Sequence, residues 1–381
     1  MNTDTHIKNE NGTNTSLPCN FMDETIADIC RTIVCALILT TSMIGNTMVA
    51  IVVYRDRKMR TTVNFLIVNM AVSDFLCSVV VIPRVLTEIH TYHGSWLIGG
   101  TTGLVLCKVV YFLQDVTVAV SLLTLLVIAI ERYNAISRPF LLDTIPKKRC
   151  AVMILSTWVL AFLMYITDFF TFEFSIVEEG LSCHHSWDRL VSDPKKATEI
   201  ESLVHTIMAL MIPSVVVIAF YTVILIRIKR TPVPGDQTSI GRRRKRRRDR
   251  NILNILLAIV LAFGFCWFPF IVYTYLVTYI WIKKDLNIEI PCYMETFGEW
   301  ALYLTFLNSS VNPVIYFTFC ENYRNGLYKL FWPCLSPCNV KQPREKGDKY
   351  APSRVQAGRY RSNRSVPRDE KEYIHLQVQN P

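Results

Sequence analysis

Seven long stretches of this chain carry almost no charged side chains. They are Thr32–Val53, Thr61–Pro83, Val109–Ile130, Cys150–Thr167, Leu203–Ile226, Asn251–Ile282 and Trp300–Cys320. Each has about 18 residues or more, and a helix that rises about 1.5 Å per residue needs roughly 20 residues to cross a hydrocarbon layer about 30 Å thick. Hydrophobic residues make up 51% of the 381 and charged residues only 19%. The sequence therefore predicts an all-α membrane protein, a seven-transmembrane helix bundle.

The distribution of positive charge predicts the orientation of these spans. Of the 41 Lys and Arg residues, nine fall on the side of the amino terminus and 32 on the opposite side. Because cytoplasmic loops are enriched in Lys and Arg, the amino terminus is expected outside the cell and the tail in the cytosol. The basic run Arg242–Arg248 could instead indicate nucleic-acid binding. A basic run between two spans more often lies against anionic lipid headgroups, and we favour that interpretation.

The predicted organisation has four parts. Residues 1–28 form an extracellular amino terminus, 29–319 the seven-transmembrane bundle, 320–333 a short amphipathic eighth helix and 334–381 a disordered cytoplasmic tail. The first 28 residues lack the basic start and apolar core of a cleaved signal, so the first span is expected to direct insertion. Asn11 and Asn14 begin Asn-X-Ser/Thr tripeptides, which predicts glycosylation there.

The cysteines divide by their predicted compartment. Cys107 and Cys183 lie at the outer end of the third span and in the long outer loop, where oxidation is permitted, and a bridge between them would hold that loop over the bundle. Cys19 and Cys292 could form a second bridge, with Cys30 as a competing partner. Two further cysteines follow the amphipathic segment and are candidate palmitoylation sites, with ordinary reduced thiols as the alternative; they are Cys334 and Cys338.

Polar residues inside the predicted spans require a reason, because a charge at bilayer depth costs at least about 2.5–3.5 kcal/mol. Asp74 lies in the middle of the second span and Ser121 in the third, while Asn308, Ser309 and Asn312 share one face of the seventh. Together they could hold a monovalent cation, since hard cations prefer oxygen ligands. A hydrogen-bonded polar plug without an ion fits the spacing equally well.

The outer half of the bundle is predicted to be polar and acidic. Tyr111, Gln114, Asp115 and Ser121 follow a helical stripe on the third span. Further acidic residues surround the same end of the bundle; they are Glu88, Asp168, Glu173, Glu201, Glu295 and Glu299. This concentration predicts an extracellular site for a ligand with positive charge or amide donors, although each acid singly could be a solvated helix-end residue.

At the cytosolic end, Glu131-Arg132-Tyr133 closes the third span and Asp249 begins the sixth. An arginine at the membrane boundary needs a carboxylate partner, and a pair that joins two helices can open as a switch. Prolines interrupt three spans and would create kinks; they are Pro213, Pro269 and Pro313.

These residues, in this order and spacing, resemble the rhodopsin-like family of G-protein-coupled receptors over about residues 30–335. The resemblance rests on one marker or more in every span. The markers are Gly45-Asn46, Asn69 with Asp74, Trp96, Cys107, Glu131-Arg132-Tyr133, Trp158, Pro213 with Tyr221, Phe263 with Cys266-Trp267-Phe268-Pro269, and Asn312-Pro313-Val314-Ile315-Tyr316.

The resemblance implies roles for matched residues. Glu131 and Asp249 would hold Arg132 at rest and release it to a G protein, and Tyr221 and Tyr316 would support the active state. Trp267, Phe263 and the prolines would relay ligand binding to outward movement of the sixth helix. The family's Na⁺ site would comprise Asp74, Ser121, Asn308, Ser309 and Asn312, which favours an allosteric ion over the polar plug. No other cofactor is implied.

The subfamily signal favours a peptide ligand. Gln114 occupies the position where monoamine receptors carry an aspartate, and it is similar to what several neuropeptide receptors have there. The alternating stretch Phe172–Ile176 is consistent with the strand-like lid of peptide receptors. The candidate ligand-binding residues are Tyr111, Gln114, Asp115, Glu201, His205, Phe270, Glu299 and Leu302.

The predicted function is therefore that of a plasma-membrane neuropeptide receptor that activates a heterotrimeric G protein and is not an enzyme. Arrestin, receptor kinases and membrane lipids are further expected partners, and nucleic acid is not. The alternatives are a receptor for a biogenic amine or other small ligand, and a polytopic transporter, which would show inverted repeats that this sequence lacks.

Overall fold

The computed structural model describes residues 5–8, 14–17, 24–91, 95–137, 147–177, 180–230, 239–278 and 292–335. The chain divides into two units, Met1–Leu335 and Ser336–Pro381, and the second lies outside the described residues. The elements of the first unit are β1 (Thr5–Lys8), β2 (Asn14–Leu17), α1 (Glu24–Arg55), η1 (Arg57–Met59), α2 (Thr62–His90), β3 (Ser95–Trp96), α3 (Gly100–Ser137), α4 (Lys147–Met164), α5 (Asp168–Thr171), β4 (Phe172–Val177), β5 (Gly180–His185), α6 (Pro194–His205), η2 (Thr206–Met211), α7 (Ile212–Arg230), α8 (Ser239–Leu276), α9 (Cys292–Phe319) and α10 (Glu321–Leu335).

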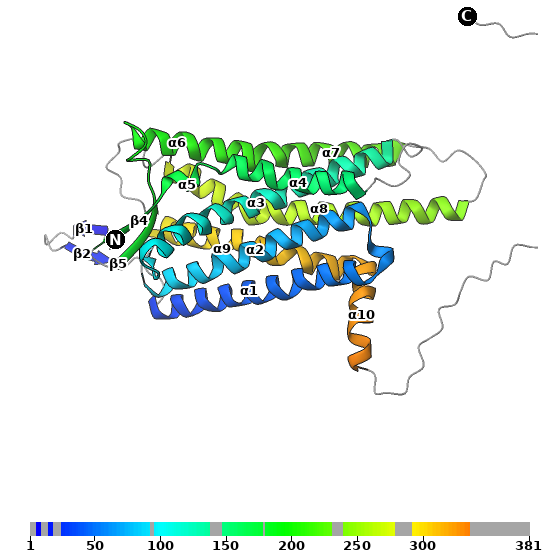
Figure 1. Cartoon of the computed structure of the whole chain (residues 1–381), viewed down its shortest axis with the longest axis horizontal. Helices are drawn as coiled ribbons and strands as arrows, with labels where there is room; N and C mark the ends of the chain where they lie inside the picture. Colours follow the sequence, from blue (N-terminus) through cyan, green and yellow to red (C-terminus); the bar gives the residue numbers. More distant parts are fainter. Residues whose placement is uncertain are drawn as a thin grey trace, which may run out of the picture. The chain divides into compact units, whose positions relative to one another are not determined.

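The long helices run side by side as one bundle (Figure 1). Within the described residues, six segments are long and apolar enough to cross a membrane: Thr25–Arg55, Thr62–His90, Gly100–Ala135, Lys148–Thr171, Pro194–Ile224 and Leu257–Leu276. The seventh helix, α9, has 28 residues and is long enough, but polar side chains such as Asn308 and Asn312 lower its hydropathy. Its polar content follows from its place inside the bundle, where it packs against α1, α2 and α8.

The fifth span is built from three consecutive segments, α6, the π-helix η2 and α7. The π-helix ends two residues before Pro213, which lacks a backbone N–H and cannot continue the i→i−4 hydrogen-bond ladder. A wider turn accommodates the missing donor. The sequence predicted an interruption at this proline, and the structure gives it the form of one π-helical stretch.

The sixth span differs from its predicted bounds. Its helix α8 begins at Ser239, twelve residues before the expected start at Asn251, so the basic run Arg242–Arg248 continues the helix. Lys and Arg have good helix propensity, and a helix that already exists can be extended beyond the hydrocarbon layer at little cost. In the same way α1 begins at Glu24, within the part predicted as the extracellular amino terminus.

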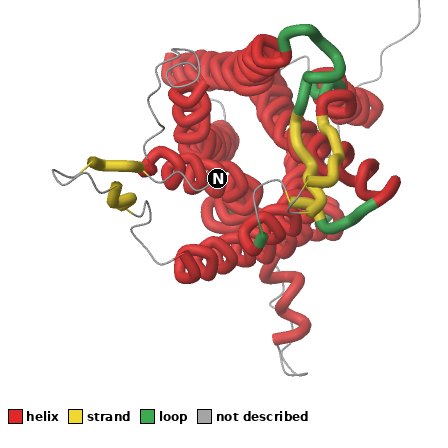
Figure 2. Tube along the Cα trace, turned by 90° about the vertical axis from the view of Figure 1, so that its left-hand side faces the viewer, coloured by secondary structure: helices red, strands yellow, loops and turns green. Residues whose placement is uncertain are grey.

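A small antiparallel sheet lies at one end of the bundle. Strands β4 and β5 form a hairpin in which Phe174 pairs with Cys183, and β3 pairs with β5 through Ser95 and Trp96. Figure 2 shows this hairpin across one side of the ring of helices. The alternating stretch Phe172–Ile176 therefore forms the predicted strand. We call this end the hairpin end and the opposite one, where α10 turns away from the bundle axis, the α10 end (Figure 1).

The surface and interior of the bundle are arranged for a lipid environment. Large apolar side chains are exposed around its outside, including Leu37, Leu155, Val215 and Phe265. Buried apolar residues fill its α10 half, where Tyr316 packs in a cluster with residues of α1, α2, α3, α7, α8 and α10. An exposed apolar surface of this extent is stable when lipid covers it. The first unit thus has the architecture of a multi-pass membrane protein.

Candidate functional site

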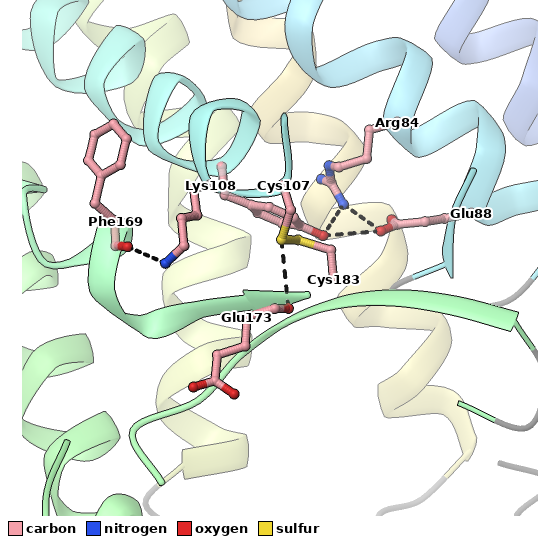
Figure 3. Close-up of a disulfide and its surroundings, with 8 residues drawn as sticks. Arg84, Glu88, Cys107, Lys108, Phe169, Glu173 and Cys183 are labelled. Atoms are coloured by element: carbon pink, nitrogen blue, oxygen red, sulfur yellow. Dashed lines mark hydrogen bonds and ion pairs between the residues drawn. A yellow bond between two sulfur atoms is a disulfide. The ribbon is translucent and has the colours of Figure 1, made fainter. Parts of the chain in front are cut away.

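The hairpin is attached to the bundle by a disulfide between Cys107 of α3 and Cys183 of β5 (Figure 3). Their Cα atoms are 5.8 Å apart, and the bridge spans 76 residues of sequence. The carbonyl oxygen of Glu173, in β4, lies 3.7 Å from Cys107 Sγ. The predicted pairing of Cys107 with Cys183 is confirmed, and it fixes both strands of the hairpin against the start of α3.

Arg84 of α2 organises a polar cluster next to the hairpin, which we call the Arg84 cluster (Figure 3). Its guanidinium donates to Glu88 Oε1 at 2.6 Å, to the Tyr111 hydroxyl at 3.1 Å and to Gln114 Oε1 at 3.1 Å. The side chains of Arg84 and Glu88 are only 8% and 10% exposed. The sequence indicated Arg84 only as one of the nine Lys and Arg residues on the side of the amino terminus. Its position one turn before Glu88, at the end of a span with few charged residues, is the signal that could have identified it.

Aromatic side chains join the Arg84 cluster to the hairpin. The Tyr111 ring stacks on Phe172 of β4 with centroids 4.2 Å apart, and the guanidinium of Arg84 lies 4.6 Å from the centroid of Tyr111. The rings of Phe172 and His185 in turn meet edge to face, with their centroids 5.4 Å apart. The predicted residues Tyr111 and Gln114 are thus together, and the hairpin supplies one wall around them.

A second group of predicted residues lies on α6. Glu201 Oε2 is 2.8 Å from His185 Nε2 and accepts a 2.8 Å hydrogen bond from Trp187 Nε1. His205 Nε2 is 3.2 Å from the carbonyl oxygen of Met164. Asp115 of α3 is near enough to interact electrostatically with Glu201 and with Arg84.

The remaining predicted ligand residues are on α8 and α9. Glu299 forms an ion pair with Arg31 of α1, and its side chain is 46% exposed. The rings of Phe270 and Trp267 meet edge to face, with their centroids 6.3 Å apart. Leu302 packs in an apolar cluster between α1, α2 and α9. No hydrogen bond or ion pair described in the structure joins Glu299 or Leu302 to the Arg84 cluster.

Most of the predicted acidic residues already have a basic partner within the chain. Glu88 pairs with Arg84, Glu173 with Arg189, Glu201 with His185 and Glu299 with Arg31. Asp115 and Asp168 form no ion pair with any residue in the described part of the chain. The sequence predicted an acidic surface, and the structure shows that much of its charge is neutralised locally.

A buried polar cluster lies deeper in the bundle. Ser121 donates to Asp74 Oδ1 at 2.7 Å and Asn312 donates to Asp74 Oδ2 at 2.7 Å, while Ser73 lies 2.7 Å from Ser121. Asp74 is only 2% exposed. Asn308 and Ser309 are also buried, but no hydrogen bond described in the structure joins their side chains to Asp74. Two of the four predicted partners of Asp74 are thus in direct contact with it.

Comparison with known proteins identifies the family. Residues 45–316 match the family described as "7 transmembrane receptor (rhodopsin family)". The chain belongs to this family. Since it is a family of receptors, the expectation of a signalling receptor in place of an enzyme or transporter is confirmed.

Several relatives of this receptor are peptide receptors by name. It is 28% identical to human neuropeptide FF receptor 1 over 316 residues, which covers 79% of this chain and 70% of the relative. It is 29% identical to neuropeptide receptor 22 of Caenorhabditis elegans, with coverages of 77% and 67%. It is 28% identical to the QRFP-like peptide receptor of Branchiostoma floridae, with coverages of 76% and 74%.

The predicted switch residues of the receptor lie toward the α10 end. Glu131 Oε1 accepts a 2.8 Å hydrogen bond from Arg132, and a second bond joins Arg132 Nε to the other carboxylate oxygen. Nothing is described of the Asp249 side chain, so its pairing with Arg132 stays a prediction. The hydroxyl groups of Tyr221 and Tyr316 are buried without a hydrogen-bond partner in the described part of the chain.

Above these residues, Trp267 stacks near Phe263 with ring centroids 5.8 Å apart. Its indole nitrogen is also buried without a described partner. Pro269 and Pro313 lie inside α8 and α9, as predicted. An unsatisfied buried polar atom costs about 1–3 kcal/mol, so these tyrosine and tryptophan groups would gain energy in an arrangement that offers them partners.

Several predicted modification sites are not described by the structure. Asn11, Cys19 and Cys338 lie outside the described residues, and the side chains of Asn14, Cys292 and Cys334 are not described either. Cys30 carries a free thiol, which removes it as the competing partner of Cys292. The second disulfide, the glycosylation and the palmitoylation stay predictions.

Proposed function

We propose that this receptor resides in the plasma membrane with its amino terminus outside, binds an extracellular neuropeptide at the hairpin end and activates a heterotrimeric G protein at the α10 end. The observation that carries the proposal is the Arg84 cluster, in which Gln114 and Tyr111 are held beside a disulfide-anchored hairpin. The names of the relatives, all three of them peptide receptors, support the ligand class.

The binding groups suit a peptide that carries a basic side chain and a polar terminus. Gln114 supplies an amide, and Asp115 supplies a carboxylate without an ion-pair partner in the described part of the chain. Glu299 is half exposed and paired with Arg31, so a ligand guanidinium would compete with Arg31 for it. Exchange of one arginine for another costs little, because the new bidentate ion pair replaces the old one.

Activation follows from a shift between two helix arrangements. Ligand contact near Phe270 and Trp267 moves α8, the bond between Arg132 and Glu131 opens, and Tyr221 and Tyr316 find partners for their hydroxyl groups. An allosteric Na⁺ at Asp74 and Ser121, with Asn308, Ser309 and Asn312 around it, favours the resting arrangement. Arrestin and receptor kinases act at the tail, and membrane lipids contact Arg242–Arg248.

The ligand site is tested by screening amidated peptides on cells that express the receptor, with calcium and cyclic-nucleotide readouts. Gln114→Ala and Glu299→Ala should each shift the response to the active peptide about tenfold or more to the right, because each removes a hydrogen bond worth about 1.5–3 kcal/mol when one partner is charged. Surface expression should not change. The matched control is Asp188→Asn, an exposed acid at the same end that binds only Ser186 among its described hydrogen bonds. Unchanged potency in both variants would refute this site.

The Na⁺ site is tested without any ligand. Replacement of Na⁺ by a large organic cation should raise basal nucleotide exchange on the G protein a few-fold in the native receptor and leave an Asp74→Asn variant unaffected. An equal response of the two proteins would refute ion binding at Asp74.

A further inference from the structure

Three potential metal ligands converge at the hairpin end, where α5 meets the last turn of α6. Asp168, Glu201 and His205 each offer one ligand atom, and these atoms all lie within 4.8 Å of one another. We call them the Asp168 cluster. Asp168 begins α5, directly after α4, while Glu201 and His205 are one turn apart on α6. The cluster therefore joins the end of the fourth span to the start of the fifth.

The Asp168 carboxylate lacks the partners that a buried acid needs. The residue is only 3% exposed, and Oδ2 is fully buried with no hydrogen-bond partner in the described part of the chain. Oε1 of Glu201 is likewise buried without a hydrogen bond. A buried carboxylate without compensation is costly, so two oxygens left open at one place indicate a missing positive group.

The surrounding charges increase this need. Asp168 interacts electrostatically with Asp115 and with Glu201, so three carboxylates share one region. Two basic side chains of this region have other partners: His185 binds the other oxygen of Glu201, and Lys108 donates to the carbonyl oxygen of Phe169. A divalent cation among these acids would remove their mutual repulsion.

The imidazole of His205 is held in a form that can bind a metal. Its Nε2 faces the carbonyl oxygen of Met164 at 3.2 Å, and a carbonyl only accepts hydrogen bonds, so Nε2 carries the proton and Nδ1 keeps its lone pair. The ring also packs against Tyr165, with centroids 4.5 Å apart. A hydrogen bond from the second ring nitrogen to a carbonyl is the usual support of a metal-bound histidine.

Glu201 is oriented in the same manner. Its Oε2 is fixed by His185 and by the indole N–H of Trp187, both at 2.8 Å, which leaves Oε1 for the cluster. Zn²⁺ binds both imidazole nitrogen and carboxylate oxygen, so one histidine with two acids is a ligand set that it accepts, whereas Ca²⁺ and Mg²⁺ bind oxygens. Ligand atoms around a tetrahedral Zn²⁺ are roughly 3.4 Å apart at bond lengths of about 2.1 Å, so small side-chain rotations would complete the site.

We propose that Asp168, Glu201 and His205 form a Zn²⁺-binding site that ties the end of α5 to the last turn of α6, beside the π-helix η2. Water fills the remaining coordination position. His185 and Trp187 act as positioning residues through Glu201. Because η2 follows His205 directly, the ion restrains the segment that connects the hairpin end to α7. The inference shares Glu201 and His205 with the candidate ligand residues, but it does not rest on peptide binding, and its test uses no peptide.

The test uses the purified full-length receptor in lipid nanodiscs, freed of metal and without peptide. Titration with Zn²⁺ should raise the apparent melting temperature to a saturating value, and Co²⁺ in its place should give the visible absorption of a tetrahedral site. Asp168→Asn and His205→Ala should each weaken Zn²⁺ binding at least tenfold. His185→Ala should weaken it about tenfold through the orientation of Glu201.

The matched control is His184→Ala. His184 is exposed and lies next to His185 on β5, so its side chain points to the opposite face of the strand. The His184→Ala receptor should bind Zn²⁺ with native affinity. Absence of saturable binding, or native affinity in both Asp168→Asn and His205→Ala, would overturn the proposal. If His205→Ala does not fold, Asp168→Asn and Glu201→Gln decide, because they keep the shape of the native side chains.

Discussion

Single polar side chains connect helices that are distant in sequence. Asn69 of α2 donates to Thr124 of α3 at 2.9 Å and to Thr157 of α4 at 3.3 Å, and its oxygen accepts from Trp158 at 2.9 Å. Three of the four hydrogen-bonding positions of this amide side chain are thus used, and they join three spans. The sequence indicated Asn69 and Trp158 as family markers. Only the structure shows that these two side chains are in direct contact and that Thr124 and Thr157 accept hydrogen bonds from Asn69.

Asn69→Ala is expected to destabilise the receptor by about 1–3 kcal/mol, because it leaves the Trp158 N–H without its acceptor and removes the amide that donates to two threonine hydroxyl groups. The apparent melting temperature of the detergent-purified receptor should fall by several degrees. Ser156→Ala is the control, since Ser156 is exposed on α4 and donates only to the carbonyl of Met153 in its own helix. An equal loss in both variants would contradict this role of Asn69.

Close helix contacts depend on small residues at particular positions. A Cβ atom added to Gly45 of α1 would lie 2.6 Å from Cγ and 2.7 Å from Cβ of Pro313 in α9. Neither atom can move easily, because the proline ring is fixed to its own backbone. The glycine therefore sets the separation of the first and seventh spans at the point where α9 carries its proline.

Gly45→Ala should push α1 away from α9 and destabilise the receptor by about 1–3 kcal/mol, the usual cost of overpacking. Gly264 of α8 has no atom within 4 Å of an added Cβ, so Gly264→Ala should leave stability unchanged or raise it by up to about 1 kcal/mol through helix propensity. Thermal unfolding of the two purified variants measures the difference. A Gly45→Ala receptor as stable as the native protein would show that α1 moves freely.

The described bundle buries several polar side chains within its apolar core and exposes large apolar side chains on its outside. Asp74, Asn69 and Asn312 are buried in the bundle, while many leucine, valine and phenylalanine side chains face outward. This arrangement is stable only with lipid around it, and the strong bias of Lys and Arg to one side then determines which way the bundle is inserted. An odd number of spans would place the two termini on opposite sides of the membrane.

An epitope tag at the amino terminus should therefore be stained on intact cells, and a tag at the carboxy terminus only after the cells are made permeable. A receptor that carries both tags provides its own control. Staining of both tags on intact cells would contradict an odd number of crossings, and with it the positions of the hairpin end and the α10 end on opposite sides of the membrane.

The sequence by itself determined the helical membrane fold, the number of spans, the Cys107–Cys183 bridge and the polar cluster at Asp74, because charge exclusion and helical spacing are local properties. It also placed Tyr111 and Gln114 on one helix face. Only the tertiary structure decided how the acids are used. Arg84 holds Gln114 and neutralises Glu88, Arg31 neutralises Glu299, and Asp168 remains open beside Glu201 and His205. Apart from the Arg84–Glu88 pair, which is one turn apart within α2, these contacts join different elements. Their distances depend on how the helices pack, which no local pattern in the sequence encodes.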